Sequence, residues 1–158
     1  MEKIASFTVN HLDLEPGIYV SRKDKVGQET LTTFDLRMTA PNKEPVMNTA
    51  EIHTLEHLGA TFLRNDPEYK DKTIYFGPMG CRTGFYFLVR DKISHSEALK
   101  IVVESFDFIK NFEGKIPGSN KEECGNYLDH DLNGAKAVAE DMSEVLKNWT
   151  EEKMNYAE

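Results

Sequence analysis

Two histidines stand four residues apart in the segment EIHTLEHLG, residues 51–59, with a carboxylate just before the second. At about 100° per residue on an α-helix, His53, Glu56 and His57 share one face. Imidazoles at positions i and i+4 converge on one metal ion, and a nearby carboxylate that does not bind the metal can act as base or acid. The segment therefore predicts a catalytic metal site, with hydrogen-bonded core or surface histidines as the alternative.

A third protein ligand is needed to complete such a site. Cys124, in the segment EECGN, is a soft donor that suits Zn²⁺ or Fe²⁺, and the glycine after it lets the backbone turn close to an ion. Two histidines and one cysteine leave one coordination position open, which is typical of catalytic rather than structural zinc sites. Taken alone, Cys124 is equally well interpreted as a loop thiol.

A second thiol, Cys81, lies in the glycine-rich segment GPMGCRTG, residues 77–84. The positive charge of Arg82 and the backbone N–H groups of a tight bend favour a negatively charged sulfur, which would serve as nucleophile or base. A cysteine merely tolerated in a connection between strands is the alternative. His130, flanked by two aspartates, is expected to orient a metal ligand or simply to cap its loop.

The bulk composition predicts one catalytic domain over residues 1–158. Hydrophobic residues make up 39% and charged residues 29% of the chain, as in an ordinary globular protein. A formal net charge of -8 argues against a nucleic-acid or an anionic membrane partner, since both are bound through clustered Lys and Arg. No signal peptide or membrane span is apparent, so we expect a cytoplasmic protein whose cysteines are reduced.

The order of predicted elements favours an α+β fold with a mainly antiparallel sheet packed with helices. Alternating and aromatic-rich segments predict strands, and capping boxes with apolar stripes predict helices. We expect strands at 18–24, 30–38, 72–79 and 83–90, and helices from Asn48 to about Arg64, from Ser94 to about Phe112, and from Asn133 to Trp149.

Several segments together resemble the S-ribosylhomocysteine lyase (LuxS) family. They occur in the family's order and spacing over nearly the whole chain, which makes their conjunction specific. The matching segments are SFTVNH at 6–11, FDLR at 34–37 with Pro41 and Asn42, HTLEHL at 53–58, GPMGCRTG at 77–84, and ECGNY at 123–127 with Asp129 and His130.

The resemblance implies a two-layer fold related to the inverted zinc peptidases and a carbon-sulfur lyase reaction. The thioether of S-ribosyl-L-homocysteine would be cleaved to L-homocysteine and 4,5-dihydroxy-2,3-pentanedione, the autoinducer-2 precursor of quorum sensing. Metal-assisted carbonyl migration would precede β-elimination, within the activated methyl cycle. The implied metal is Fe²⁺, with Zn²⁺ or Co²⁺ as substitutes, and the implied assembly is a homodimer with active sites at its interface.

The same resemblance assigns roles to individual residues. His53, His57 and Cys124 match the metal ligands, Cys81 and Glu56 match the acid-base pair, and substrate binding is implied for Ser6, His11 and Arg37. From the residues alone, a surface residue is the alternative for His11, and Arg37 is interpreted as a solvated charge that only the resemblance makes a substrate anchor. The chain departs from the family pattern at 75–77, where Tyr-Phe-Gly replaces the common Asp-Ile-Ser, so any hydrogen bond from that aspartate is lost or replaced.

Two other functions stay open at this point. The H-x-x-E-H order also occurs in inverted-motif zinc metalloproteases, in which the glutamate activates water. Such a peptidase has no use for a reactive Cys81, and 158 residues are few for a fold that must hold an extended substrate. A non-enzymatic metal-binding domain would instead close the site with a fourth protein ligand, for example Cys81.

Overall fold

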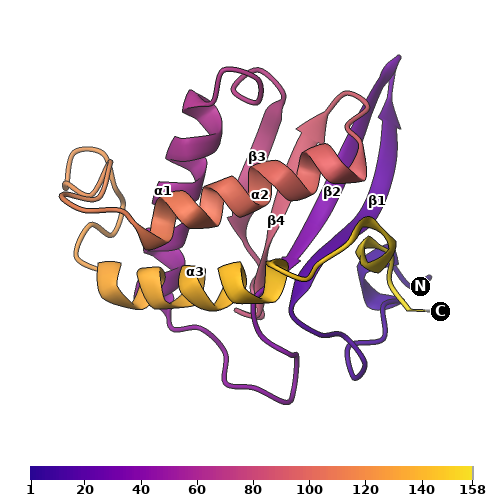
Figure 1. The fold of residues 1–158 in the computed structure, drawn as a ribbon, viewed down its shortest axis with the longest axis horizontal. Helices are drawn as coiled ribbons and strands as arrows, with labels where there is room; N and C mark the ends of the chain where they lie inside the picture. The colour runs from indigo at the N-terminus through magenta and orange to yellow at the C-terminus, as the bar shows by residue number, and fades with distance from the viewer. Residues whose placement is uncertain (158) are drawn as a thin grey trace.

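Four strands form one antiparallel sheet in the order β1-β2-β4-β3 in the computed structural model, which describes residues 1–157. Three helices cover one face of this sheet (Figure 1). The elements in chain order are η1 (Ala5–Phe7), β1 (Gly17–Val26), β2 (Glu29–Arg37), α1 (Thr49–Asn65), β3 (Thr73–Pro78), β4 (Gly84–Arg90), α2 (His95–Lys110), α3 (Leu132–Leu146) and η2 (Glu151–Met154). The predicted α+β class is confirmed.

The two predicted strand pairs are both present. β1 and β2 form a hairpin whose turn includes Gly27, in the left-handed region at φ 62°. β3 and β4 pair across the bend that contains Cys81. β4 then pairs with β2, so the second hairpin extends the first into a single sheet. The chain must cross over between β2 and β3, and α1 is part of that connection.

The capping boxes predicted for α1 and α2 are confirmed. Asn48 accepts a hydrogen bond from the backbone N–H of Glu51, whose carboxylate accepts from the N–H of Asn48, and Ser94 and Glu97 do the same for α2. These pairs satisfy N–H groups that have no partner within the first helical turn. The start of α1, and with it the orientation of its histidine face, is therefore fixed by local sequence.

The third helix differs from its prediction at both ends. Asp131, rather than a residue after it, is the N-cap, because its side chain accepts from the backbone N–H of Gly134. The helix ends at Leu146, before Trp149, whose indole N–H donates to the carbonyl of Ile18 at 3.0 Å. Trp149 occupies the space beside Gly17 where a Cβ would lie 2.2 Å from its ring, so tertiary packing ended the helix early.

The core lies between the helices and one face of the sheet. Phe34 on β2 and Phe87 on β4 are register partners, and with Phe85 they are completely buried. Tyr86 and Leu88 alternate with these residues and are only half-buried, because they lie on the other face, which none of α1, α2 and α3 covers. A two-layer arrangement thus leaves a partly apolar sheet face accessible.

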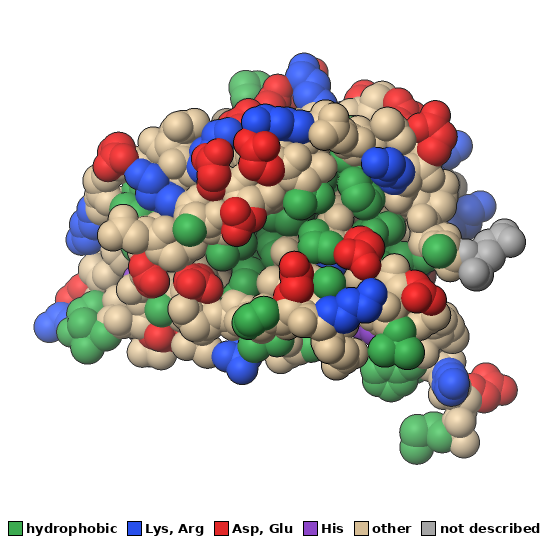
Figure 2. All heavy atoms as spheres, turned by 60° about the horizontal axis from the view of Figure 1, so that its bottom comes forward, with side chains coloured by type: hydrophobic (Ala, Val, Ile, Leu, Met, Phe, Trp, Pro, Cys, Tyr) green, Lys and Arg blue, Asp and Glu red, His purple; other side chains and the backbone are tan. Residues whose placement is uncertain are grey.

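The surface carries charges of both signs. Figure 2 shows acidic and basic side chains intermixed over one face of the molecule, with hydrophobic side chains exposed between them. Within residues 1–157, no helix combines the length and the apolar character that crossing a bilayer requires.

Close packing of α1 against β3 makes a first prediction. A Cβ at Gly59 would lie 2.3 Å from Cε1 of Phe76, which is 7% exposed. We expect Gly59→Ala to lower the free energy of unfolding by about 1–2 kcal/mol in urea titrations, because overpacking outweighs the better helix propensity of alanine. The double variant Gly59→Ala/Phe76→Leu should lose less free energy of unfolding than the two single variants lose in sum. An increase in the free energy of unfolding of Gly59→Ala would contradict this view of the contact.

Candidate metal centre and active site

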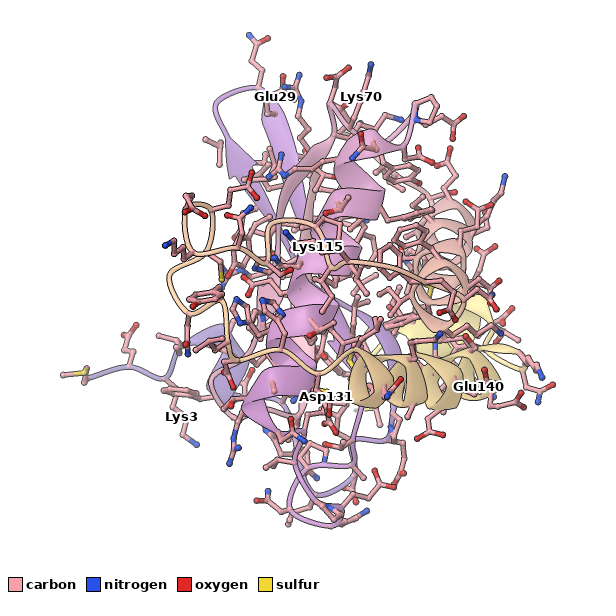
Figure 3. The ribbon with its side chains drawn as sticks, turned by 90° about the vertical axis from the view of Figure 1, so that its left-hand side faces the viewer. Lys3, Glu29, Lys70, Lys115, Asp131 and Glu140 are labelled. Carbon is pink, nitrogen blue, oxygen red and sulfur yellow. The ribbon has the colours of Figure 1, made fainter. Side chains whose placement is uncertain are left out.

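Two hydrogen bonds orient the histidines of α1. The Nδ1 of His53 donates to the carbonyl of Asp129 at 2.8 Å, and the Nδ1 of His57 donates to the carbonyl of Pro117 at 2.7 Å. Both carbonyls belong to the connection between α2 and α3, which lies across α1 (Figure 3). Because a carbonyl only accepts, each imidazole is held in the tautomer whose Nε2 lone pair is free to bind a metal.

The sulfur of Cys124 lies next to both free nitrogens. Its Sγ is 3.4 Å from Nε2 of His53 and 4.0 Å from Nε2 of His57. For bond lengths of about 2.0 Å to nitrogen and 2.3 Å to sulfur, two ligands of one tetrahedral ion are about 3.5 Å apart. The rings of His53 and His57 are inclined at 85°, so lone pairs in their two planes can meet at one point. The three residues predicted as metal ligands therefore fit one ion.

A third histidine, His130, joins this cluster as its fourth potential ligand. Nε2 of His130 is 3.9 Å from Sγ of Cys124, and the ring of His130 stacks on that of His53 with 4.0 Å between centroids. The four potential ligand atoms all lie within 4.8 Å of one another. Burial and the neighbouring charges of His53 and His57 lower the pKa of His130, which favours its neutral form. The sequence placed His130 near the site only as one of two alternatives.

An open pocket of about 510 Å³ lies beside the cluster. Glu56 lines it, one helical residue before His57, and is half-buried. The pocket is also lined by the ring of Phe76 and by the backbone turn around Gly118, where a Cβ would lie 3.3 Å from the His57 ring. A small molecule in this pocket would thus contact both the carboxylate and the candidate metal ligands.

Cys81 lies in a different environment, at the end of a buried polar chain. Nη1 of Arg37 donates to Oγ1 of Thr83 at 2.6 Å, and Oγ1 of Thr83 is 3.1 Å from Sγ of Cys81. Since a guanidinium can only donate, Thr83 accepts from it and keeps its own proton for the sulfur. Cys81 itself is exposed. A hydroxyl hydrogen bond to an exposed sulfur stabilises negative charge there.

Arg37 is more deeply buried than the sequence suggested. It is 3% exposed and donates from Nε and Nη2 to the two carboxylate oxygens of Asp35, at 3.1 and 2.7 Å. Burial by itself lowers the pKa of Arg37, but the hydrogen bonds and charge of Asp35 outweigh it and raise the pKa above the ordinary value. The side chain is thus a fixed part of the fold as well as a candidate for substrate binding.

The other two predicted site residues, Ser6 and His11, do not line the pocket beside the metal cluster in this chain. Ser6 lines a second pocket on the uncovered sheet face, together with Tyr75 and Tyr86. Nδ1 of His11 donates to the carbonyl of Val9 at 2.9 Å. In the Tyr-Phe-Gly segment that departs from the family pattern, Tyr75 packs directly against Gly77. A Cβ at Gly77 would lie 2.1 Å from the hydroxyl of Tyr75, so the tyrosine and the glycine fit together.

Comparison with known proteins gives one consistent result. The family model described as S-Ribosylhomocysteinase (LuxS) matches residues 4–153. Among curated relatives, S-ribosylhomocysteine lyases from Finegoldia magna and Clostridium acetobutylicum are 58% and 56% identical, each over 100% of both chains. The S-ribosylhomocysteine lyase of Porphyromonas gingivalis is 53% identical over 99% of both chains.

The cluster predicts metal binding that depends on each of three side chains. We expect the purified protein to bind one equivalent of Co²⁺ with visible bands typical of a four-coordinate ion, and His57→Ala or Cys124→Ala to lose that binding because too few ligands remain. His95→Ala is the matched control, since His95 lies partly exposed at the start of α2 and does not belong to the cluster. Unchanged Co²⁺ binding in both ligand variants would contradict the assignment.

Proposed function

The chain belongs to the S-ribosylhomocysteinase (LuxS) family, and from this premise we propose that its site cleaves the thioether of S-ribosyl-L-homocysteine. The products are L-homocysteine and 4,5-dihydroxy-2,3-pentanedione, the autoinducer-2 precursor. The observation that carries the proposal is the convergence of His53, His57 and Cys124 beside a pocket lined by Glu56. The relatives matched over their whole length are lyases, so neither a metalloprotease nor a non-enzymatic metal domain is favoured.

His53, His57 and Cys124 would hold the metal, and the proposed ion is Fe²⁺, with Zn²⁺ or Co²⁺ as substitutes. When bound, such an ion with an open coordination position supplies Lewis acidity that polarises a sugar carbonyl or hydroxyl oxygen. The free Nε2 lone pairs support this set, because Asp129 and Pro117 fix the required tautomers before any ion arrives.

The reaction needs protons to be moved along the sugar. The C–S bond at C5 cannot break by β-elimination until a carbonyl stands at C3, which makes the C4 proton acidic. Starting from the open aldehyde, a base must move the C2 proton to C1 and then the C3 proton to C2, while protons pass between the hydroxyl oxygens. Removal of the C4 proton then expels homocysteine from C5, and the remaining enol becomes the diketone.

Cys81 and Glu56 are the groups proposed for these transfers. Cys81 as a thiolate removes the protons on carbon, and the hydrogen bond available from Thr83 stabilises that thiolate. Glu56 shuttles protons between substrate oxygens and acts in the elimination, for which its place in the metal pocket is suited. Each is a general acid or base whose contribution is typically about 10²- to 10⁴-fold in rate.

Two copies of the chain are proposed to complete each active site. Cys81, Ser6, His11 and Arg37 do not line the pocket that contains Glu56. The uncovered sheet face beside Ser6 carries half-buried apolar side chains, as a face that packs against a second copy does. In such a homodimer, substrate-binding groups of one copy meet the metal centre of the other.

The remaining parts of the proposal concern the setting of the enzyme. Residues 1–158 act as one catalytic domain in the cytoplasm, with no nucleic-acid or membrane partner. Both cysteines are free thiols, as the reaction requires and as a reducing compartment allows.

The reaction itself is tested by thiol release. We expect Co²⁺-loaded protein, purified without air, to release homocysteine from S-ribosyl-L-homocysteine, as measured with a thiol reagent. Glu56→Gln and Cys81→Ala should lower kcat by about 10²- to 10⁴-fold, because each removes a proton carrier. His95→Ala is the control and should keep wild-type turnover. Full turnover of Cys81→Ala would contradict the assignment of Cys81 as the base.

The shared active site is tested by mixing two inactive variants. Cys81→Ala and His57→Ala chains are unfolded together, refolded and loaded with Co²⁺. If the two residues act in one site from different copies, half the dimers are mixed and each carries one intact site, so about a quarter of wild-type activity should return. The same variants refolded separately are the control. A mixture as inactive as its components would place Cys81 and the metal in the same copy.

A further inference from the structure

His130 contacts the metal cluster differently from its two neighbours. Where His53 and His57 direct Nδ1 to backbone carbonyls, His130 directs Nδ1 to the side chain of Thr54, at 3.0 Å from Oγ1. Its Nε2 faces the sulfur of Cys124. The partner of Nδ1 therefore decides whether Nε2 of His130 carries a proton or a lone pair.

The hydroxyl of Thr54 settles this. Thr54 is completely buried, and its Oγ1 already accepts from the backbone N–H of Asp131 at 3.0 Å. Its own proton needs an acceptor, because a buried hydroxyl that donates to nothing costs about 1–3 kcal/mol. Among the side-chain contacts of residues 1–157, Nδ1 of His130 is the acceptor available to it. Nδ1 is therefore unprotonated, and the neutral ring carries its proton on Nε2.

The ring planes independently argue against His130 and His53 binding the same ion. The rings of His53 and His130 are only 20° from parallel with centroids 4.0 Å apart, so one lies above the other. An imidazole binds a metal through an in-plane lone pair, and the lone pairs of two stacked, nearly parallel rings do not meet at one point. His57, inclined at 85° to His53, has no such conflict.

We propose that His130 is not a fourth metal ligand but a positioning residue whose Nε2–H donates to the Cys124 thiolate, with Thr54 holding it in that tautomer. The inference rests on the proposed function, because it supposes that Cys124 binds a metal as a thiolate. The 3.9 Å from Nε2 to Sγ is within hydrogen-bonding range for sulfur.

Such a hydrogen bond has two consequences for the centre. It withdraws electron density from the sulfur, so the thiolate donates less to the ion and leaves it a stronger Lewis acid. It also occupies Nε2, so His130 does not fill the position that a substrate oxygen must take. Thr54, on the buried side of α1 one residue after His53, thereby influences the metal without touching it.

The experiment is the near-ultraviolet spectrum of the Co²⁺-loaded protein, in which a band arises from charge transfer from sulfur to cobalt. His130→Phe keeps a ring to stack on His53 but has no N–H, and His130→Gln keeps an N–H donor at the position of Nε2. Thr54→Val removes the hydroxyl that fixes the tautomer, and Thr54→Ser keeps it. Co²⁺ affinity is measured for each by competition with a chelator.

We expect the charge-transfer band of His130→Phe to move to longer wavelength, since an unbonded thiolate loses its electron more easily, while the visible bands stay four-coordinate. Co²⁺ affinity should nevertheless fall by about 10- to 100-fold, because the sulfur loses the donor that orients it and favours the thiolate over the thiol. Thr54→Val should change the band in the same direction, and His130→Gln and Thr54→Ser should remain close to wild type.

Two results would overturn this inference and leave the proposed function intact. One is an unmoved charge-transfer band in both His130→Phe and Thr54→Val. The other is a loss of Co²⁺ binding in His130→Phe as complete as that in His57→Ala, which would make His130 a ligand. Absence of the band from the wild-type protein would instead remove the metal–thiolate bond itself, and with it the proposed centre.

Discussion

The donation of two imidazole Nδ1–H groups to the backbone of one connection is the interaction on which the centre depends. Through Asp129 and Pro117, the segment between α2 and α3 is held against α1, and the same bonds turn both Nε2 lone pairs toward Cys124. A histidine that lost its carbonyl partner would be free to rotate and to change tautomer. The same hydrogen bonds therefore hold the connection between α2 and α3 in place and orient the two histidine side chains.

Rigid packing behind α1 keeps this arrangement in place. The capping box fixes where the helix begins, and Gly59 lets Phe76 approach the helix backbone so closely that a methyl group would clash. Phe76 in turn stacks on Phe85 of the core, with ring centroids 5.0 Å apart. The pocket wall is thus continuous with the hydrophobic core, which leaves the ligand-bearing face of the helix little freedom to move.

A second buried network supports the turn that carries Cys81. Asp35 and Arg37 form an ion pair that is almost inaccessible to solvent, and Tyr156, near the end of the chain, donates to the same carboxylate at 2.7 Å. Burial and the charge of Asp35 raise the pKa of Tyr156, so this hydroxyl keeps its proton. The remaining guanidinium nitrogen of Arg37, Nη1, donates to Thr83, which in turn contacts the thiol. A buried pair of this kind is worth more for fixing orientation than for stability, because desolvation offsets much of the attraction.

The sequence by itself determined the elements and the nature of the ligands. Period-two segments and two capping boxes predicted four strands and the starts of two helices, since these signals are local and do not depend on distant partners. The i, i+4 spacing of His53 and His57 predicted the metal-binding face of α1 for the same reason. The order of segments predicted the family.

Only the tertiary structure decided how those residues are used. The carbonyls that set the tautomers belong to Asp129 and Pro117, and no side-chain pattern reveals them because every residue has a carbonyl. The early end of α3 follows from the contact of Trp149 with Gly17, and the burial of Arg37 from its pairing with Asp35. The placement of His130 beside the sulfur of Cys124 is supported by a hydroxyl 76 residues away. Long-range hydrogen bonds and steric contacts have no local signature, and they are what turn a set of donors into a centre.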